Sequence, residues 1–355
     1  MRAFTCGHCG QLVFFENSLC LRCSTPLGFA PWLLEVVTRD AEHPDWQGLR
    51  QCSNAGSAHC NWMLEPGDAG PLCRSCRLTR ARPSDRDLEG LEQFAAAEAA
   101  KRRLLFQLLD LGLPVESGGL TFDLLTSRAG PVTTGHADGL ITLDLAESDD
   151  ARREARRAEL DEPYRTLLGH FRHEVGHFVW PMLVAQTGDG ALEQCRELFG
   201  DERADYGEAL ERHYAVGAPA DWNERHVSTY ATSHPWEDWA ETWAHYLHIR
   251  DTLQTAGAYR LFVGGPSEAA DPGLVAAPAA EPERPPFETL IGDWLPLTYA
   301  LNAVNRSMGR GDLYPFTLAP TVIDKLSFVH ERVSLVGGDG GSAASRRPAV
   351  GGLVS

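Results

Sequence analysis

The amino-acid sequence predicts an α+β protein, in which a mostly helical body with a small sheet follows a small cysteine-rich module. Eight of the nine cysteines lie in the first 76 residues. Apolar residues recur at helical spacing in residues 161–180 and 233–249, whereas residues 130–145 read as strand, turn and strand. The chain has 355 residues, which is long enough for more than one domain.

The charge of the chain is unevenly distributed. The formal net charge is −17, yet residues 1–87 contain nine basic and nine acidic side chains, so the whole acidic excess lies in residues 88–355. Because an acidic body repels phosphate backbones and anionic membranes, we expect it to bind neither. The start of the chain has no apolar run that would form a signal peptide, and no apolar stretch is long enough to span a bilayer. These features favour a cytoplasmic location.

Two C-x-x-C pairs open the chain, and we predict that they form a zinc ribbon over residues 1–28. The four cysteines are Cys6, Cys9, Cys20 and Cys23. Thiolates are preferred ligands of Zn²⁺, and two such turns close a tetrahedron around the ion. A module of this size buries too little apolar surface to fold alone, so the metal would supply folding energy. We therefore expect a structural zinc site without chemistry of its own.

A second set of four cysteines follows with looser spacing, and we predict a second structural zinc site within residues 29–87. Its members are Cys52, Cys60, Cys73 and Cys76. The neighbouring His8 and His59 could each replace a cysteine, although we favour solvent-facing positions for both. Residues 77–87 are basic, contain a proline and are predicted to be a linker into the body.

The body is predicted over residues 88–335. A helix is expected from Leu88 to Leu111, and the dipeptide Asp138-Gly139 indicates a hairpin turn. Further stretches are interpreted by composition: residues 149–160 as a charged helix, residues 200–232 as largely helical, residues 256–286 as an irregular insertion, and residues 336–355 as a disordered tail.

The segment LLGHFRHEVGHFVW, residues 167–180, contains an HExxH motif, which is typical of zinc-dependent hydrolases. We expect its helix to start at residues 161–163 and to end or kink at Pro181. His173 and His177 are four residues apart, so both imidazoles project from one side of the helix and can hold Zn²⁺. Glu174 is rotated by about 100° from His173 and is suited to accept a proton from a metal-activated water. The competing explanation is a chance match on an ordinary amphipathic helix.

A third metal ligand is expected from the helix that contains SHPWEDWAETWAHYLHI. Glu237 and Glu241 share one face, together with His234, His245 and His248, and four aromatic residues are predicted on the opposite side. Those aromatic residues are Trp236, Trp239, Trp243 and Tyr246. Buried carboxylates need a partner, and a cation would provide one.

The motif pair HEVGH and EDWAE resembles that of glutamate zincins, in which HExxH is followed by E-x-x-A-D/E. This resemblance implies that Glu237 is the third ligand, that Ala240 leaves room beside the metal, and that Glu241 orients a ligand histidine. The chain has Glu241 where Asp is commoner, so the sequence leaves open which of Glu237 and Glu241 contacts the metal.

The whole layout resembles a bacterial family of zinc-binding metallopeptidases that carry an N-terminal zinc ribbon. The matching stretches include CGHCGQLVFFEN, TGHADGLITLDLAE, FRHEVGHFVW, LFGDERADY and DWLPLTYALNAVNRSMG. The resemblance implies a zincin-like metallopeptidase domain with one catalytic zinc besides one or two structural zincs. It also implies that the strand DGLITLDL pairs with extended substrate.

The sequence thus predicts hydrolysis of peptide bonds by a zinc-activated water with Glu174 as general base. Tyr230 is the preferred donor to the transition-state oxyanion, with His234 and Tyr206 as alternatives, and Cys195 is expected to be an unreactive buried thiol. The ribbon is expected to recruit a protein substrate or partner, and its arginines leave nucleic acid open for that module alone. The alternatives are a non-catalytic zinc-binding adaptor and a zinc hydrolase of non-peptide bonds.

Overall fold

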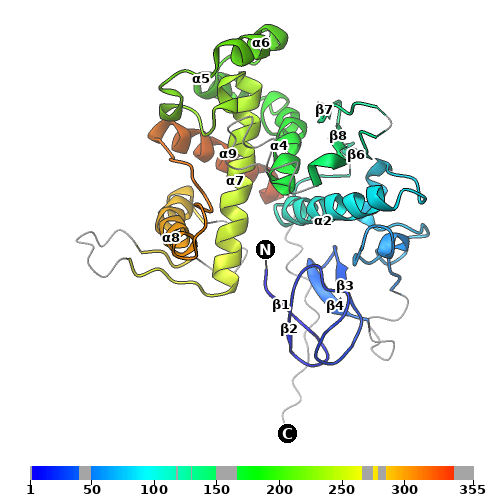
Figure 1. Cartoon of the computed structure of the whole chain (residues 1–355). Coiled ribbons are helices and arrows are strands. Elements are labelled where there is room, and N and C mark those ends of the chain that lie inside the picture. The colour runs from blue at the N-terminus through cyan, green and yellow to red at the C-terminus, as the bar shows by residue number, and fades with distance from the viewer. Residues whose placement is uncertain are drawn as a thin grey trace.

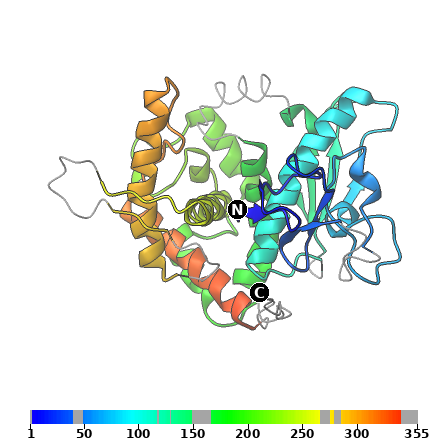
Figure 2. The same cartoon turned by 90° about the horizontal axis from the view of Figure 1, so that it is seen from below.

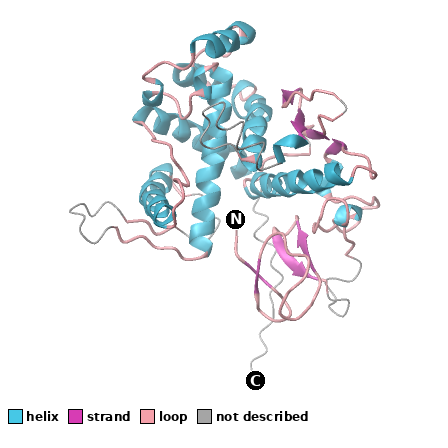
Figure 3. Cartoon of the chain, in the orientation of Figure 1, coloured by secondary structure: helices cyan, strands magenta, loops and turns pink. Residues whose placement is uncertain are grey.

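The computed structural model describes residues 2–39, 49–116, 119–128, 130–148, 166–265, 275–278 and 285–339. Helices dominate the body, and the strands gather in the N-terminal module and along one side of the body (Figure 3). None of the helices described is long and apolar enough to cross a membrane.

The N-terminal module contains two small antiparallel pairs. Strand β1 (Phe4–Thr5) pairs with β2 (Leu12–Val13), and β3 (Leu27–Ala30) pairs with β4 (Glu35–Thr38). In the second cysteine set, Cys52 directly precedes the 3-10 turn η2 (Ser53–Ala55). Cys73 directly precedes the short helix α1 (Arg74–Arg77), and Cys76 lies within it. Four buried aromatic side chains of this module, Phe4, Phe15, Phe29 and Trp62, pack together. Three of them also contact the ring of Phe106, so the module shares a core with the body.

Helix α2 (Leu88–Asp110) lies between this module and the other helices (Figure 1). Asp87 caps its start by accepting a hydrogen bond from the Gly90 backbone at 3.0 Å. The helix ends before Gly112, whose φ of 71° stops further helix formation. The prediction of a helix over residues 88–111 is therefore confirmed.

A four-stranded sheet covers one side of the body, in the order β5-β6-β8-β7. Its strands are β5 (Thr79–Ala81), β6 (Thr121–Leu125), β8 (Leu140–Asp144) and β7 (Gly135–Ala137). The first three run parallel, and β7 pairs antiparallel with β8 through the turn at Asp138 and Gly139, which have positive φ values. The predicted hairpin is confirmed.

Two expectations about this sheet are wrong. The segment predicted to be a linker contains β5, because its backbone finds a parallel partner in β6, about 40 residues further on. The strand DGLITLDL, which we expected to be free for substrate, is β8 and lies between β6 and β7. Among the described strands, β7 therefore forms the edge of the sheet next to the candidate site.

The remaining elements are helical, and one of them, α7 (Pro235–Ala258), is seen end-on near the centre of the molecule in Figure 2. The others pack against α7, against α2 or against one another. These elements are η3 (Leu145–Ser148), α4 (Leu167–Trp180), the π-helical turn η4 (Pro181–Ala185), α5 (Ala191–Phe199), α6 (Tyr206–Val216), η5 (Trp222–Glu224), η6 (Tyr230–Thr232), α8 (Phe287–Ser307) and α9 (Pro320–Asp339).

Several predicted boundaries need correction. Helix α4 begins at Leu167 rather than at residues 161–163, because Thr166 is extended and its side chain caps the Gly169 backbone at 2.9 Å. Residues 200–232 contain a single α-helix, α6, and two 3-10 turns. Helix α9 extends to Asp339, so the first residues of the predicted tail are helical. The predicted charged helix at residues 149–160 and the rest of the tail lie outside the described residues.

Helices α4 and α7 cross at two small residues, Gly176 and Ala240. A Cβ atom added to Gly176 would lie 2.9 Å from the Ala240 Cα atom and 3.0 Å from the Trp243 ring. The indole of Trp239 donates a 2.8 Å hydrogen bond to the Gly176 carbonyl oxygen at the same crossing. Because Gly176 has no side chain, the backbones of the two helices lie close together at this point.

We predict that Gly176→Ala destabilises the protein, although alanine normally favours a helix. The added methyl group meets backbone that cannot move independently, and overpacking of this kind costs about 1–3 kcal/mol. The matched control is Gly292→Ala in α8, where an added Cβ meets no atom within 4 Å. The control should be neutral or stabilising by up to about 1 kcal/mol. Urea unfolding of both variants tests this, and equal stabilities would contradict the proposed close crossing.

Candidate metal centre

The structure brings together both predicted cysteine sets. In the first set, the sulfur atoms of Cys6 and Cys23 are 3.7 Å apart and those of Cys9 and Cys20 are 3.6 Å apart. In the second set, the Cys60 and Cys73 sulfurs are 3.7 Å apart, and Cys52 and Cys76 complete the group. Sulfurs at the usual Zn–S distance stand about 3.8 Å apart in a tetrahedron, so both sets fit zinc. His8 and His59 are exposed and belong to neither set, as favoured from the sequence.

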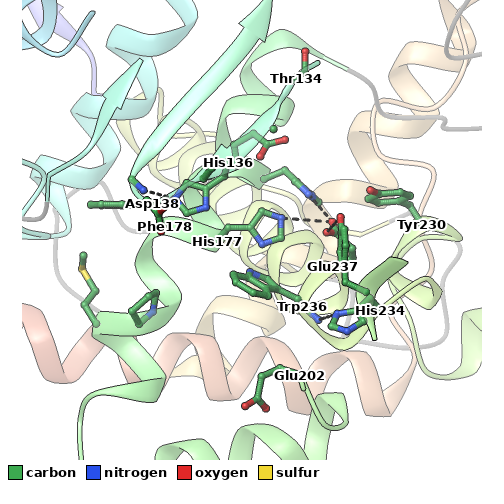
Figure 4. Close-up of a pocket in the computed structure, with 18 of the residues that line it drawn as sticks. Thr134, His136, Asp138, His177, Phe178, Glu202, Tyr230, His234, Trp236 and Glu237 are labelled. Atoms are coloured by element: carbon green, nitrogen blue, oxygen red, sulfur yellow. Dashed lines mark hydrogen bonds and ion pairs between the residues drawn. The ribbon is translucent and has the colours of Figure 1, made fainter. Parts of the chain in front are cut away.

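A third group of metal-ligating side chains lies in the body and consists of His173, His177 and Glu237. One ligand atom from each lies within 4.8 Å of the others, and all three residues are at most 8% exposed. The Glu237 Oε2 atom is 3.0 Å from the His173 Nε2 atom and 3.5 Å from the His177 Nε2 atom. Ligand atoms of a tetrahedral zinc with Zn–N and Zn–O distances near 2.1 Å are about 3.4 Å apart. The three side chains therefore fit zinc, and Figure 4 shows His177 and Glu237 directed toward each other.

Glu241 contacts the opposite side of the His173 ring. Its Oε1 atom is 2.6 Å from the His173 Nδ1 atom, and its Oε2 atom accepts a 2.6 Å hydrogen bond from the Ser228 hydroxyl. Burial raises the pKa of Glu241, but the contact with His173 outweighs it and lowers this pKa to about 2. The carboxylate thus holds hydrogen on Nδ1 and leaves Nε2 free to bind a metal. This arrangement gives Glu237 the position of a ligand and Glu241 that of an orienting residue.

Glu174 lies beside the three candidate ligands and is 5% exposed. Burial raises its pKa, but the hydrogen bond from His170 and the charges of neighbouring histidines outweigh this and hold the pKa below its ordinary value. The carboxylate therefore stays ionised, as a proton acceptor requires.

A cavity of about 950 Å³ opens over this group. The residues of β7 line one side of it, Tyr230 lies near Glu237 (Figure 4), and Tyr206 also lines the cavity. An apolar wall is formed by Phe178, Pro181, Met182 and Trp236. Trp236 was predicted on the opposite side of α7. That prediction is wrong, because Trp236 lies in the first turn of the helix and its ring stacks on Trp180 and contacts His177.

The three candidate oxyanion donors differ in their contacts. The Tyr206 hydroxyl donates a 2.8 Å hydrogen bond to Glu237 Oε1. His234 caps α7, and its two ring nitrogens are bonded to the Trp236 backbone nitrogen and the Ala204 carbonyl oxygen. The Tyr230 ring lies 5.9 Å from that of His173, and burial raises the pKa of its phenol, which keeps the hydroxyl proton in place. Tyr230 and Tyr206 are thus better placed as donors than His234.

Two residues near the site were missed by the sequence reasoning. His136 on β7 stacks on His177 with ring centroids 6.2 Å apart, and its Nε2 accepts a hydrogen bond from the Gly139 backbone. Glu147 in η3 contacts His170 at 2.6 Å. His136 stands two residues before a strong turn signal, which could have drawn attention to it. Glu147 has no comparable signal, because its partner is 23 residues away.

Cys195 in α5 is buried, and burial raises the pKa of its thiol to about 12. The thiol is therefore protonated at neutral pH and a poor nucleophile. This agrees with the predicted unreactive cysteine.

Comparisons with known proteins give two family matches. A family model described as "Putative zinc-binding metallo-peptidase" matches residues 90–332, and a zinc-ribbon domain model matches residues 3–87. Uncharacterised proteins of Mycobacterium tuberculosis and Mycobacterium bovis are 49% identical to the chain, over 98% of its length and 99% of theirs. No solved structure matches the chain.

We predict that the full-length protein loses one zinc per chain when His173 and His177 are both replaced by alanine. The cysteine sets do not share ligands with this group, so their zinc should stay bound. Elemental analysis of the wild type and of the double variant measures the change. An equal zinc content in the two proteins would show that the histidine pair holds no metal as purified.

Proposed function

The chain belongs to the family of zinc-binding metallopeptidases, and we propose that it is a zinc-dependent peptidase whose catalytic metal is held by His173, His177 and Glu237. The observation that carries this proposal is the convergence of two Nε2 atoms and one carboxylate oxygen at zinc-like spacing. Three protein ligands leave a fourth position for water or substrate, as in catalytic zinc sites.

Zinc bound there would supply Lewis acidity, which polarises the scissile carbonyl and lowers the pKa of the attacking water. Glu174 would accept a proton from that water and then deliver it to the leaving amine. Its ionised state and its position beside the ligand group support this role. Glu241 and Ser228 would keep the His173 ring oriented throughout.

Strand β7 is the proposed docking edge for an extended peptide. It pairs with β8 on one side, and its residues line the cavity. A peptide strand that adds to such an edge gains backbone hydrogen bonds and places its amide bonds along the sheet. The apolar wall around Trp236 and Met182 would then accept a side chain of the peptide.

The cysteine-rich module is proposed to recruit a protein substrate or partner. Its surface carries several exposed apolar side chains, among them Phe14 at 57% and Leu21 at 90% exposure. Such residues favour protein contacts over the phosphate contacts that dominate nucleic-acid binding.

Two other functions compete. In a non-catalytic adaptor the zinc group of the body would be structural, and in a hydrolase of non-peptide bonds the substrate would differ. The cavity beside Glu174 favours an enzyme, since a purely structural zinc site has four protein ligands and is closed.

We predict that Glu174→Gln lowers peptide hydrolysis by about 10²–10⁴-fold while zinc content is unchanged, because the amide cannot accept the proton. The assay uses a mixture of quenched fluorescent peptides with the zinc-loaded full-length protein. Glu331→Gln on the exposed side of α9 is the matched control and should keep full activity. An adaptor would show no metal-dependent hydrolysis in the wild type.

We also predict that Tyr230→Phe lowers kcat by about 10²-fold or more with little change in KM. Removal of a single oxyanion donor has an effect of this size, because the donor acts on charge that develops in the transition state. Tyr206→Phe is the comparison, since Tyr206 already donates to Glu237. A larger loss of kcat in Tyr206→Phe than in Tyr230→Phe would transfer the role to Tyr206.

A further inference from the structure

A continuous row of polar side chains, joined by ion-pair contacts and hydrogen bonds, leads away from Glu174. The His170 Nε2 atom is 3.2 Å from Glu174 Oε1, and the His170 Nδ1 atom is 2.6 Å from Glu147 Oε2. The other oxygen of Glu147 accepts a 2.9 Å hydrogen bond from the Thr134 hydroxyl. The side chains of Glu147 and Glu174 are at most 7% exposed and that of His170 is 17% exposed, so water competes little for these contacts.

The two ends of this row belong to different parts of the site. His170 precedes Glu174 by one turn of α4, which places the two side chains on one side of the helix. Thr134 directly precedes the edge strand β7, and its hydroxyl also accepts a hydrogen bond from the Asp144 backbone. The row therefore connects the proposed base to the strand that would bind substrate.

The contacts fix how His170 is protonated. Both of its ring nitrogens face carboxylate oxygens, which can only accept a hydrogen bond when they are ionised. A ring that donates from both nitrogens is an imidazolium. Burial lowers the pKa of His170, but the contacts with Glu147 and Glu174 outweigh burial and raise it to about 9. His170 is thus a fixed cationic donor between two carboxylates.

We propose that His170, held by Glu147, is a positioning residue that fixes the carboxylate of Glu174 for proton transfer. This inference rests on the peptidase function proposed above. A glutamate side chain has three rotatable bonds, and a base displaced by 1 Å can cost about 10²-fold in rate. The contact of His170 with Oε1 restricts the rotamers of Glu174, whose side chain lines the cavity. A merely structural ion pair would instead contribute to stability without affecting the proton transfer.

Three substitutions of His170 separate these roles. His170→Phe keeps an aromatic ring and removes both polar contacts. His170→Gln keeps a donor at the position of Nε2, toward Glu174, whereas His170→Asn keeps one at the position of Nδ1, toward Glu147. The matched control is His330→Phe in α9, which removes a buried histidine that contacts Tyr246 at 3.2 Å and lies outside the cavity.

In zinc-loaded full-length protein, we expect His170→Phe and His170→Asn to lower kcat by about 10-fold to 10²-fold, with KM within twofold of the wild type. His170→Gln should recover a part of kcat, and zinc content should be unchanged in all three. His330→Phe should lower the thermal midpoint without lowering kcat. A kcat of His170→Phe within twofold of the wild type, or equal losses in Gln and Asn variants, would overturn the proposal.

A second measurement does not need a substrate. Benzohydroxamate chelates zinc and donates a hydrogen bond to a neighbouring carboxylate. Its dissociation constant, measured by calorimetry on the zinc-loaded protein, therefore depends on the position of the Glu174 carboxylate. We expect Glu174→Gln and His170→Phe to weaken its binding by similar factors, and His170→Gln to weaken it less. If the wild type hydrolyses no peptide, the peptidase proposal fails, and this titration still decides the positioning role. A dissociation constant of benzohydroxamate that is unchanged in His170→Phe would overturn the positioning role of His170.

Discussion

The candidate site depends on the close crossing of α4 and α7. The two histidines come from one helix and Glu237 comes from the first turn of the other, so their ligand atoms meet only if the helix backbones nearly touch. Gly176 and Ala240 permit that contact. The hydrogen bond from the Trp239 indole to the Gly176 carbonyl oxygen holds the two helices in a fixed orientation relative to each other. Larger residues at either position would move Glu237 away from both imidazoles. The short distance between the helices is therefore a requirement of the metal group as well as a packing feature.

Around this crossing, nearly every buried acidic group has a cationic or donor partner. Glu241 contacts His173 and Ser228, Glu174 contacts His170, and Asp238 contacts Lys325 at 2.6 Å. Burying a charge without a partner is costly, so these contacts keep Glu241 and Glu174 ionised, whereas burial raises the pKa of Asp238 to about 7 despite Lys325. Glu237 differs from the others, because its Oε2 atom contacts two imidazoles whose Nε2 atoms also face the shared centre. A divalent cation at that centre would neutralise Glu237 and let both histidines be neutral ligands.

The sequence predicted the features that repeat locally or follow a known motif. Helix-end signals predicted α2, helical spacing of apolar residues predicted the helices α4 and α7, the dipeptide Asp138-Gly139 predicted the hairpin, and the spacing of the cysteines predicted both cysteine sets. The sequence could not predict β5, because its partner β6 is about 40 residues away and the pairing leaves no local pattern. For the same reason the contact of Glu147 with His170 was missed, as was β7 as the edge of the sheet. Helical-wheel reasoning misplaced Trp236, because the first turn of α7 faces the cavity and not the core.

The cysteine-rich module and the metal group of the body are connected through two adjacent residues of α2. Phe106 packs against three aromatic rings of the module, whereas Gln107 accepts a hydrogen bond from Arg172 of α4 and donates one to the Leu247 carbonyl oxygen of α7. Since α2 is one rigid helix, a change in the packing of Phe106 also changes the position of Gln107. Zinc bound by the cysteines would order the short module that carries those aromatic rings. It would therefore stabilise the same helix that supports both ligand-bearing helices, even though the cysteine sets share no ligand with the candidate catalytic site.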